Sequence, residues 1–197
     1  MAHGPSYKVD YKRKRKGLTN YRKRLKLLSS GLHRFVIRKS NNATMCQVIE
    51  YDEKGDKTIV AASSLDLKKY GYKGHTGNIP AAYLTGLMCG LKAKHHKITT
   101  AIFDIGLYRS TKGSRMYAAV KGAADGGLQI PFDEKILPDI KRISGHHITE
   151  YAKILKTKDP HKYNKLFSHM LKESLEPEKM TEHFEEIKKK IISEKAS

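Results

Sequence analysis

The pattern of apolar and polar residues in the first third of the chain predicts three consecutive β-strands. Segments 34–39, 45–51 and 58–62 alternate apolar with polar residues and are rich in β-branched side chains. The turns between them, 40–42 and 52–56, contain Asn and Gly residues that favour a reversal of the backbone. These segments therefore predict the beginning of a sheet.

A helix and a buried strand are expected next. After a linker over 63–77, Asn78 is placed to cap a helix that has Pro80 in its first turn. The apolar stripe of this helix recurs at every fourth residue. Segment 98–106 is apolar almost throughout, which is typical of a strand buried on both faces. The stripe consists of Ile79, Tyr83, Leu87 and Leu91.

Two more helical segments complete the central part of the chain. An alanine-rich helix is expected over about 114–124, before two glycines, and a second helix over 133–144, ended by Gly145. Between them, 128–132 is a short strand or an extended turn. The order of three strands, helix, strand and helix predicts an α/β domain with helices on the faces of a sheet.

The two ends of the chain differ in pattern from the centre. Residues 1–17 indicate irregular backbone, followed by a helix from Thr19, a plausible N-cap, to Ser30. Its leucines share one face, so we expect them to dock on a core while its cations point outward. Residues 157–197 carry nine Lys and eight acids. They predict one or two amphipathic helices that dock on the domain or on a partner, or alternatively a partly frayed extension.

We therefore expect a basic arm and helix over 1–31, a core domain over 32–155 and a helical extension over 156–197. The net charge of the chain is +19, and the first 39 residues hold thirteen Lys and Arg against one acid, Asp10. Such a segment is poorly suited to fold alone and well suited to a polyanion, because each phosphate contact releases counterions. Bases can stack on aromatic residues that interrupt the charge at Tyr7, Tyr11, Tyr21 and Phe35. The arm is predicted to bind RNA.

Other locations and partners are less consistent with the sequence. The chain has no run of 18 apolar residues and no apolar signal region, and the apolar stripe of the arm is too thin for a membrane-surface helix. Cys46 and Cys89 are far apart, which favours a reducing compartment. We expect a soluble cytoplasmic protein without a membrane partner.

Two loops combine polar residues with the start of a helix. Loop 70–78 has glycines at every third position from Gly71, but it lacks the Gly-Lys-Ser/Thr of a P-loop. It is interpreted as an RNA-contacting loop, an ordinary connection or a nucleotide-binding loop. Loop 108–115 carries cations and hydroxyls without an acid. Phosphate contact is favoured there over a solvated loop that only caps the helix.

Enzymatic and metal-binding functions find little support. The pairs His95–His96 and His146–His147 are adjacent, and no cysteine lies at ligand spacing, so neither a metal nor another cofactor is expected. A two-metal nuclease would need several carboxylates at the strand ends, and only Asp66, Asp104 and Asp125 are available. We therefore expect no catalytic residues and a protein that is not an enzyme.

Three segments, taken together, resemble one family. Residues 8–42 are similar to the N-terminal arm and first strand of the family of large-subunit ribosomal protein eighteen, whose members bind 5S ribosomal RNA. Residues 74–93 are similar to its first core helix, and residues 99–131 to its strand-loop-helix segment. The resemblance covers about residues 5–155, and the extension resembles the archaeal form rather than the shorter bacterial one.

The resemblance implies a three-layer α/β/α fold with a mixed sheet of ribonuclease-H-like topology and no nuclease activity. It implies a constituent of the large ribosomal subunit that holds 5S rRNA against the large rRNA in the central protuberance, beside neighbouring ribosomal proteins. A non-ribosomal structured-RNA-binding protein or RNA chaperone is the alternative. The RNA contacts that it implies in the arm, the sheet edge and the two loops are Lys12, Arg13, Arg15, Lys16, Thr19, Tyr21, Arg22, Arg24, Arg38, Asn41, Tyr72, Lys73, His75, Arg109, Thr111, Lys112 and Arg115.

Overall fold

Four strands form a mixed sheet in the order β3-β2-β1-β4, in a computed structural model that describes residues 4–196 and the side chains of residues 4–194. Three strands form an antiparallel meander, and β4 runs parallel to β1, with Phe35 opposite Phe103. The three strands predicted in the first third of the chain are confirmed. The strands are β1 (His33–Lys39), β2 (Thr44–Glu50), β3 (Lys57–Ser63) and β4 (Ala101–Asp104).

The expectation for β4 was wrong in part. It lies at an edge of the sheet, and Ile102 and Phe103 are only partly buried, because few residues pair with its outer side. The segment after the second core helix contributes a single parallel bridge, between Thr100 and Gln129, rather than a full strand. The apolar run around β4 therefore serves an edge strand that is half covered.

Two helices cover one face of the sheet. In α3 (Ile79–His95) the Asn78 side chain accepts a hydrogen bond from the backbone N–H of Ala81, as the sequence predicts. The second helix, α4 (Arg115–Asp125), agrees with the predicted alanine-rich helix. The two helices approach closely because Gly86 has no side chain. A Cβ there would lie 1.9 Å from the carbonyl oxygen of Ala119. They cover the core residues Phe35, Ile37, Cys46 and Val48 of the sheet.

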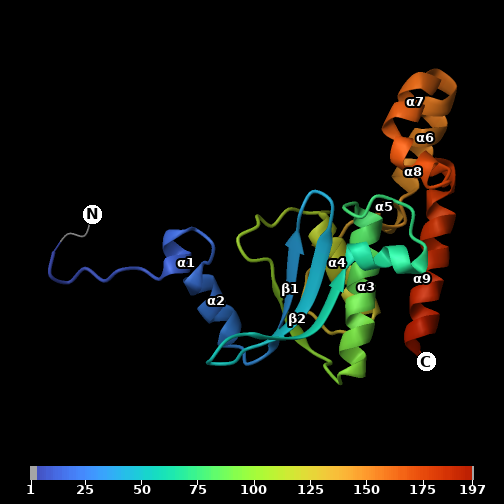
Figure 1. Cartoon of the computed structure of the whole chain (residues 1–197). Coiled ribbons are helices and arrows are strands. Elements are labelled where there is room, and N and C mark those ends of the chain that lie inside the picture. Colours follow the sequence, from blue (N-terminus) through green and yellow to red (C-terminus); the bar gives the residue numbers. More distant parts are fainter. Residues whose placement is uncertain (1–3, 197) are drawn as a thin grey trace.

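The arm lies across the opposite face and differs from expectation in three ways (Figure 1). It contains a short helix, α1 (Lys12–Arg15), where irregular backbone was expected. The next helix, α2 (Tyr21–Leu28), is capped by Asn20 rather than by Thr19. Its leucines do not dock on a core as predicted: no residue of α2 is buried, and Leu25 is 70% exposed. The reason is that the surface opposite α2 includes the charged groups of Arg34 and Asp56.

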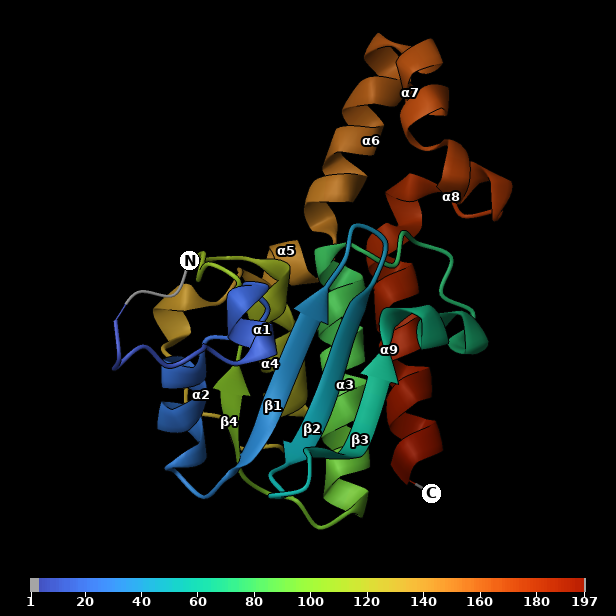
Figure 2. The ribbon, with the colours of Figure 1, turned by 60° about the vertical axis from the view of Figure 1, so that its left-hand side comes forward.

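The C-terminal residues form one helix that docks and a group of helices that projects. In α9 (Met180–Ala196) four apolar residues are buried in the main core, so the alternative of a frayed extension is wrong for this part. Figures 1 and 2 show α9 outside α3 and a lobe of three helices above the sheet. The buried residues of α9 are Met180, Phe184, Ile187 and Ile191. The lobe consists of α6 (His146–Lys158), α7 (Pro160–Leu166) and α8 (Ser168–Lys172).

The remaining segments are short. The expected helix over 133–144 is interrupted, since Pro138 favours extended backbone in the residue before it. The result is a 3-10 turn and a four-residue helix. Within residues 4–196, no helix has both the length and the apolar character that a membrane span requires. The short elements are η1 (Ser64–Tyr70), η2 (Glu134–Ile136), α5 (Ile140–Ile143) and η3 (Pro177–Lys179).

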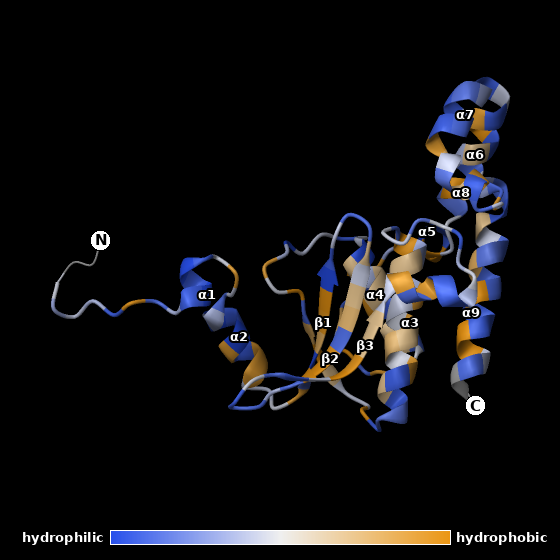
Figure 3. Ribbon diagram, in the orientation of Figure 1, coloured by the Kyte–Doolittle hydropathy of each residue, from blue (hydrophilic) through white to orange (hydrophobic). Residues whose placement is uncertain are grey.

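The colours of Figure 3 summarise the arrangement, with an apolar centre in the sheet and α3 and a hydrophilic α1. The sheet order, the parallel β4 and the helices on both sides agree with the predicted three-layer α/β/α fold.

Candidate nucleic-acid interface

Alternation along β1 gives the sheet its polar face. Phe35 and Ile37 point into the core, so Arg34, Val36 and Arg38 lie on the side of the arm. The guanidinium of Arg34 is almost completely buried there. It donates to Asp104 at 2.9 Å and contacts Asp56 at 2.5 Å, so one buried cation joins two carboxylates from opposite edges of the sheet.

The second cation that pairs with Asp56 comes from the arm. Arg24 of α2 donates two parallel hydrogen bonds to the Asp56 carboxylate, at 2.8 and 2.7 Å. These bonds raise the pKa of Arg24 and, opposed by partial burial, lower the pKa of Asp56. A bidentate pair of this kind fixes orientation as well as charge. Arg24 therefore fastens α2 to the sheet.

Arg38 lies on the same face, near the C-terminal end of β1. It donates to the carbonyl oxygens of Ile37 at 2.8 Å and Asp104 at 3.1 Å, and its side chain stays 42% exposed. Gly106, two residues after Asp104, has a left-handed φ of +61°, and a Cβ there would lie 2.9 Å from the Arg38 guanidinium carbon. The left-handed backbone favours glycine at this position, and the absent side chain leaves room for the Arg38 guanidinium beside the chain.

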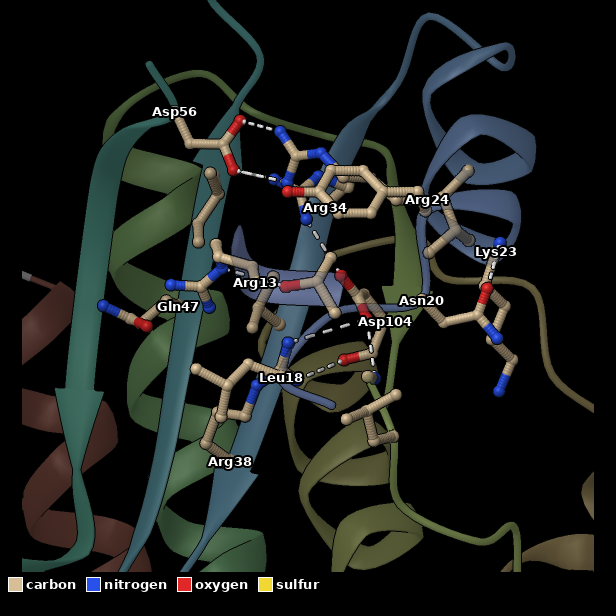
Figure 4. Close-up of a pocket in the computed structure, with 17 residues that line it drawn as sticks. Arg13, Leu18, Asn20, Lys23, Arg24, Arg34, Arg38, Gln47, Asp56 and Asp104 are labelled. Carbon is tan, nitrogen blue, oxygen red and sulfur yellow. Dashed lines mark hydrogen bonds and ion pairs between the residues drawn. The ribbon is translucent and has the colours of Figure 1, made fainter. Parts of the chain in front are cut away.

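A pocket of about 590 Å³ remains between α2 and this face of the sheet. Figure 4 shows the arginines and carboxylates along it, together with Gln47 of β2 and Asn20 at the start of α2. Both polar and apolar side chains line the pocket, and it is partly open to solvent. The apolar lining residues include Leu18, Leu27, Val36, Ile49 and Leu107.

The predicted RNA contacts of the arm mostly face solvent. The cations of α1 are all exposed, and the Arg13 Nε donates to the Thr19 hydroxyl at 2.9 Å, which joins α1 to the segment before α2. The Tyr21 ring lies 5.1 Å from that of Tyr11, centroid to centroid. The predicted contacts that lie exposed on the arm are Lys12, Arg13, Arg15, Lys16 and Arg22.

Three loops that carry the other predicted contacts are bonded to one another near the end of β1. The Thr76 hydroxyl donates to the carbonyl of Asn42 at 2.5 Å. Arg115 donates to the carbonyl oxygens of Gly77 at 2.6 Å and Ser40 at 2.5 Å. The loops therefore form one joined surface, named here the loop surface. Its exposed predicted contacts are Asn41, Lys73, His75, Arg109, Thr111 and Lys112.

Tyr72 and Arg115, like Arg24, are predicted contacts whose side chains are bonded to protein groups. Tyr72 is 3% exposed, donates its hydroxyl to Asn78 and stacks on His183 of α9, and burial raises its pKa. Arg115 is half-buried, and both of its terminal nitrogens are used by backbone carbonyls. The structure places these two side chains where they position the loop surface.

Sequence reasoning missed Arg34, Gln47 and Asp56. The signal for the first two was present, because Arg34 precedes apolar Phe35 and Gln47 lies between apolar Cys46 and Val48, so alternation along a strand turns both away from the core. Asp56 was assigned to a turn, and its pairing with residues 22 and 32 positions away depends on the tertiary structure.

The carboxylates considered for a nuclease are bonded to protein groups at separate places. Asp66 belongs to the capping box of η1, and Asp125 accepts from Tyr83 at 2.7 Å and pairs with Lys121 at 3.0 Å. Asp104 is held by the arginines of the polar face. Within the described residues, no group of three or more His, Cys, Asp or Glu side chains is placed to hold a metal ion.

A comparison with known families gives this geometry a context. The model of the family described as ribosomal large subunit proteins 60S L5, and 50S L18 matches residues 5–99 and 91–133. The chain belongs to this family. As a member it is a structural constituent of the large subunit of the cytoplasmic ribosome, and its partners are ribosomal RNA and other ribosomal proteins.

The family match covers the arm, the sheet and both core helices of this ribosomal protein. It ends at residue 133, before the helices of the projecting lobe and α9. The polar face and the loop surface therefore both lie in the part that the family shares.

Proposed function

We propose that this ribosomal protein binds 5S rRNA with its arm and the polar face of its sheet, and anchors it to the large rRNA in the central protuberance. The observation that carries the proposal is the attachment of the arm. Arg24 and Asp56 hold α2 over the sheet, and none of the four cations of α1 is buried. Cations on an anchored segment offer RNA phosphates a fixed set of contacts, which cations on a loose tail do not.

The exposed aromatic residues of the arm support contacts beyond phosphate. Tyr7 is 50% exposed and Tyr11 is 72% exposed. Single-stranded loops and bulges of RNA offer bases that stack on such rings, and this contribution depends little on salt. The arm is thus equipped for both electrostatic and stacking contacts.

The loop surface supports a role as an anchor between two RNA segments. It is built from loops at the end of β1 and combines the exposed cations Lys73, Arg109 and Lys112 with the exposed amide of Asn41. Two basic surfaces on one rigid domain can hold two segments of RNA at a fixed separation. Arg115 and Thr76 keep the second surface in place.

The test is a filter-binding titration of 5S rRNA against a transfer RNA, from about 50 to 300 mM salt. We expect a preference for 5S rRNA of about a hundredfold or more that persists at high salt. Equal binding that disappears with salt would contradict the proposal and would favour an RNA chaperone with a basic arm.

Removal of residues 1–24 tests the role of the arm directly. The truncated protein should keep its fold, because Arg34 still pairs with both Asp56 and Asp104, and it should lose tight binding. If the arm makes about 6 to 10 phosphate contacts, the affinity of the intact protein falls about 10³- to 10⁵-fold between 50 and 200 mM salt. Unchanged affinity of the truncated protein would exclude this use of the arm.

A further inference from the structure

The pocket between α2 and the sheet contains polar groups that the ion pairs do not use. Among the described residues, the side chains of Gln47 and Lys23 have no hydrogen-bond or ion-pair partner. Gln47 lies between Cys46 and Val48, which are both fully buried on the other face, so the strand directs its amide to the pocket. A partly buried amide without a partner is available to a ligand.

The charge of the lining favours an anion. Five cations and two carboxylates line the pocket, and both carboxylates are already bonded to arginines. Arg13 and Lys23 add positive charge from the side of the arm, and Arg38 adds it from the sheet. The excess positive charge suits a phosphate group rather than a neutral or cationic ligand.

The walls suit a flat aromatic group. Tyr21 lines the pocket from α2, and Val36 and Ile49 line it from the sheet. Its volume of about 590 Å³ lies within the range of small-ligand sites, roughly 300–1,000 Å³. An aromatic ring, an apolar wall, a free amide and cations are the groups that a nucleotide requires for its base, its base edge and its phosphates.

We propose that this pocket takes a single unstacked nucleotide of the bound RNA, with its base against Tyr21, the edge of the base at the Gln47 amide and its phosphates near Arg13 and Lys23. This inference rests on the proposed function, because it names how part of that RNA is recognised. The Gln47 amide offers one acceptor and two donors, so it can form a bidentate pair with a base edge. The pocket thereby supplies sequence preference, which the cations of α1 cannot supply.

The experiment compares salt titrations of 5S rRNA binding for the full chain and three variants. Gln47→Leu removes the hydrogen bonds while keeping the size of the side chain. Gln129→Leu makes the same change at an exposed position outside the pocket, and Arg13→Gln removes one charge.

We expect Gln47→Leu to weaken binding about tenfold or more without a change in the salt slope, since no phosphate contact is lost. Arg13→Gln should weaken binding and reduce the slope by about one. Gln129→Leu should bind like the unchanged protein.

If Gln47→Leu binds within about twofold of the unchanged protein while Arg13→Gln is weakened, the pocket proposal fails and the proposed function survives. If the unchanged protein shows no preference for 5S rRNA over transfer RNA, the proposed function itself fails.

Chemical probing of base accessibility in 5S rRNA gives a second readout. One unpaired nucleotide should be protected by the full chain and become reactive again with Gln47→Leu at a saturating protein concentration. If Gln47→Leu does not fold, Gln47→Glu keeps the shape and places a carboxylate at the base edge. Protection of the same nucleotide by both the full chain and the folded Gln47 variant would overturn the proposal.

Discussion

Both ends of the chain carry a helix that packs outside the sheet, and the two are attached by different forces. Among its eight residues α2 has none that is buried, and it is joined to the sheet by the Arg24–Asp56 pair. By contrast, α9 buries four apolar side chains, with Phe184 and Ile187 at 2% and 0% exposure. The N-terminal attachment is ionic and the C-terminal attachment is apolar.

This difference matches what each helix is placed to do. Removing apolar area from water stabilises α9 on α3 in any ionic conditions, so α9 acts as part of the core. An ion pair at a partly exposed site contributes less and can exchange with a phosphate that offers similar hydrogen bonds. The ion pair therefore orients the arm and still lets it adjust to the RNA that we propose it binds.

The largest effect should come from breaking the apolar attachment. Phe184→Ala in α9 deletes a ring that packs near Tyr83 of α3, with centroids 5.6 Å apart. We expect the free energy of unfolding to fall by about 3–5 kcal/mol, measured by urea denaturation, because a buried cavity remains.

The matched variant on the arm is Leu25→Ala. Leu25 is 70% exposed, so its removal should change the free energy of unfolding by less than about 0.5 kcal/mol. A loss of less than about 1 kcal/mol for Phe184→Ala would mean that α9 is not part of the core.

A smaller effect should follow from breaking the ionic attachment. Asp56→Ala removes the partner of Arg24 and one of the two partners of Arg34. We expect a loss of about 1–3 kcal/mol in the free energy of unfolding, because a buried guanidinium loses one carboxylate. Hydrogen exchange should show that the amides of α2 lose protection while those of β1 keep theirs.

Asp10→Ala is the control for this change. The Asp10–Lys14 pair is about half exposed on both sides, and its loss should change the free energy of unfolding by less than about 0.5 kcal/mol. Retained protection of the α2 amides in Asp56→Ala would show that other contacts hold the arm.

The contrast between the two ends also shows what the sequence could predict. Period-two alternation in β1, the cap at Asn78 and the apolar spacing of α9 are local signals, and the corresponding elements are confirmed. The orientation of α2 was missed because its leucines indicate an apolar face, whereas the surface opposite it is formed by Arg34 and Asp56.

The candidate site was predictable to a similar extent. The exposed cations of α1 follow from charge alone. The positioning roles of Tyr72 and Arg115 do not, since a tyrosine and an arginine in a glycine-rich or polar loop have the composition of a binding loop. Their partners, His183 and the carbonyl of Ser40, are more than 70 residues away in the sequence and meet them only in the fold.

The smallest effect concerns the contact between the loop surface and α9. The His183 Nε2 accepts a hydrogen bond from the backbone N–H of Lys73 at 3.1 Å, and the ring stacks on Tyr72. Burial lowers the pKa of His183, and the positive charges of Lys73 and Lys190 lower it further, while Glu186 opposes them. The folded state therefore prefers the neutral imidazole.

A lowered pKa in the folded state fixes the sign of the pH dependence. The unfolded chain binds a proton at higher pH than the folded one, so this stabilisation is complete above the ordinary histidine pKa, about 6.5, and is lost as the pH falls through the lower pKa of the folded state. We expect the free energy of unfolding to decrease over that range by at most about 1.4 kcal/mol per pH unit. Urea denaturation of the intact protein and of His183→Gln, from about pH 8 to 5, measures it. The variant should lose this part of the slope, and an identical slope in both proteins would show that His183 does not link the loop surface to α9.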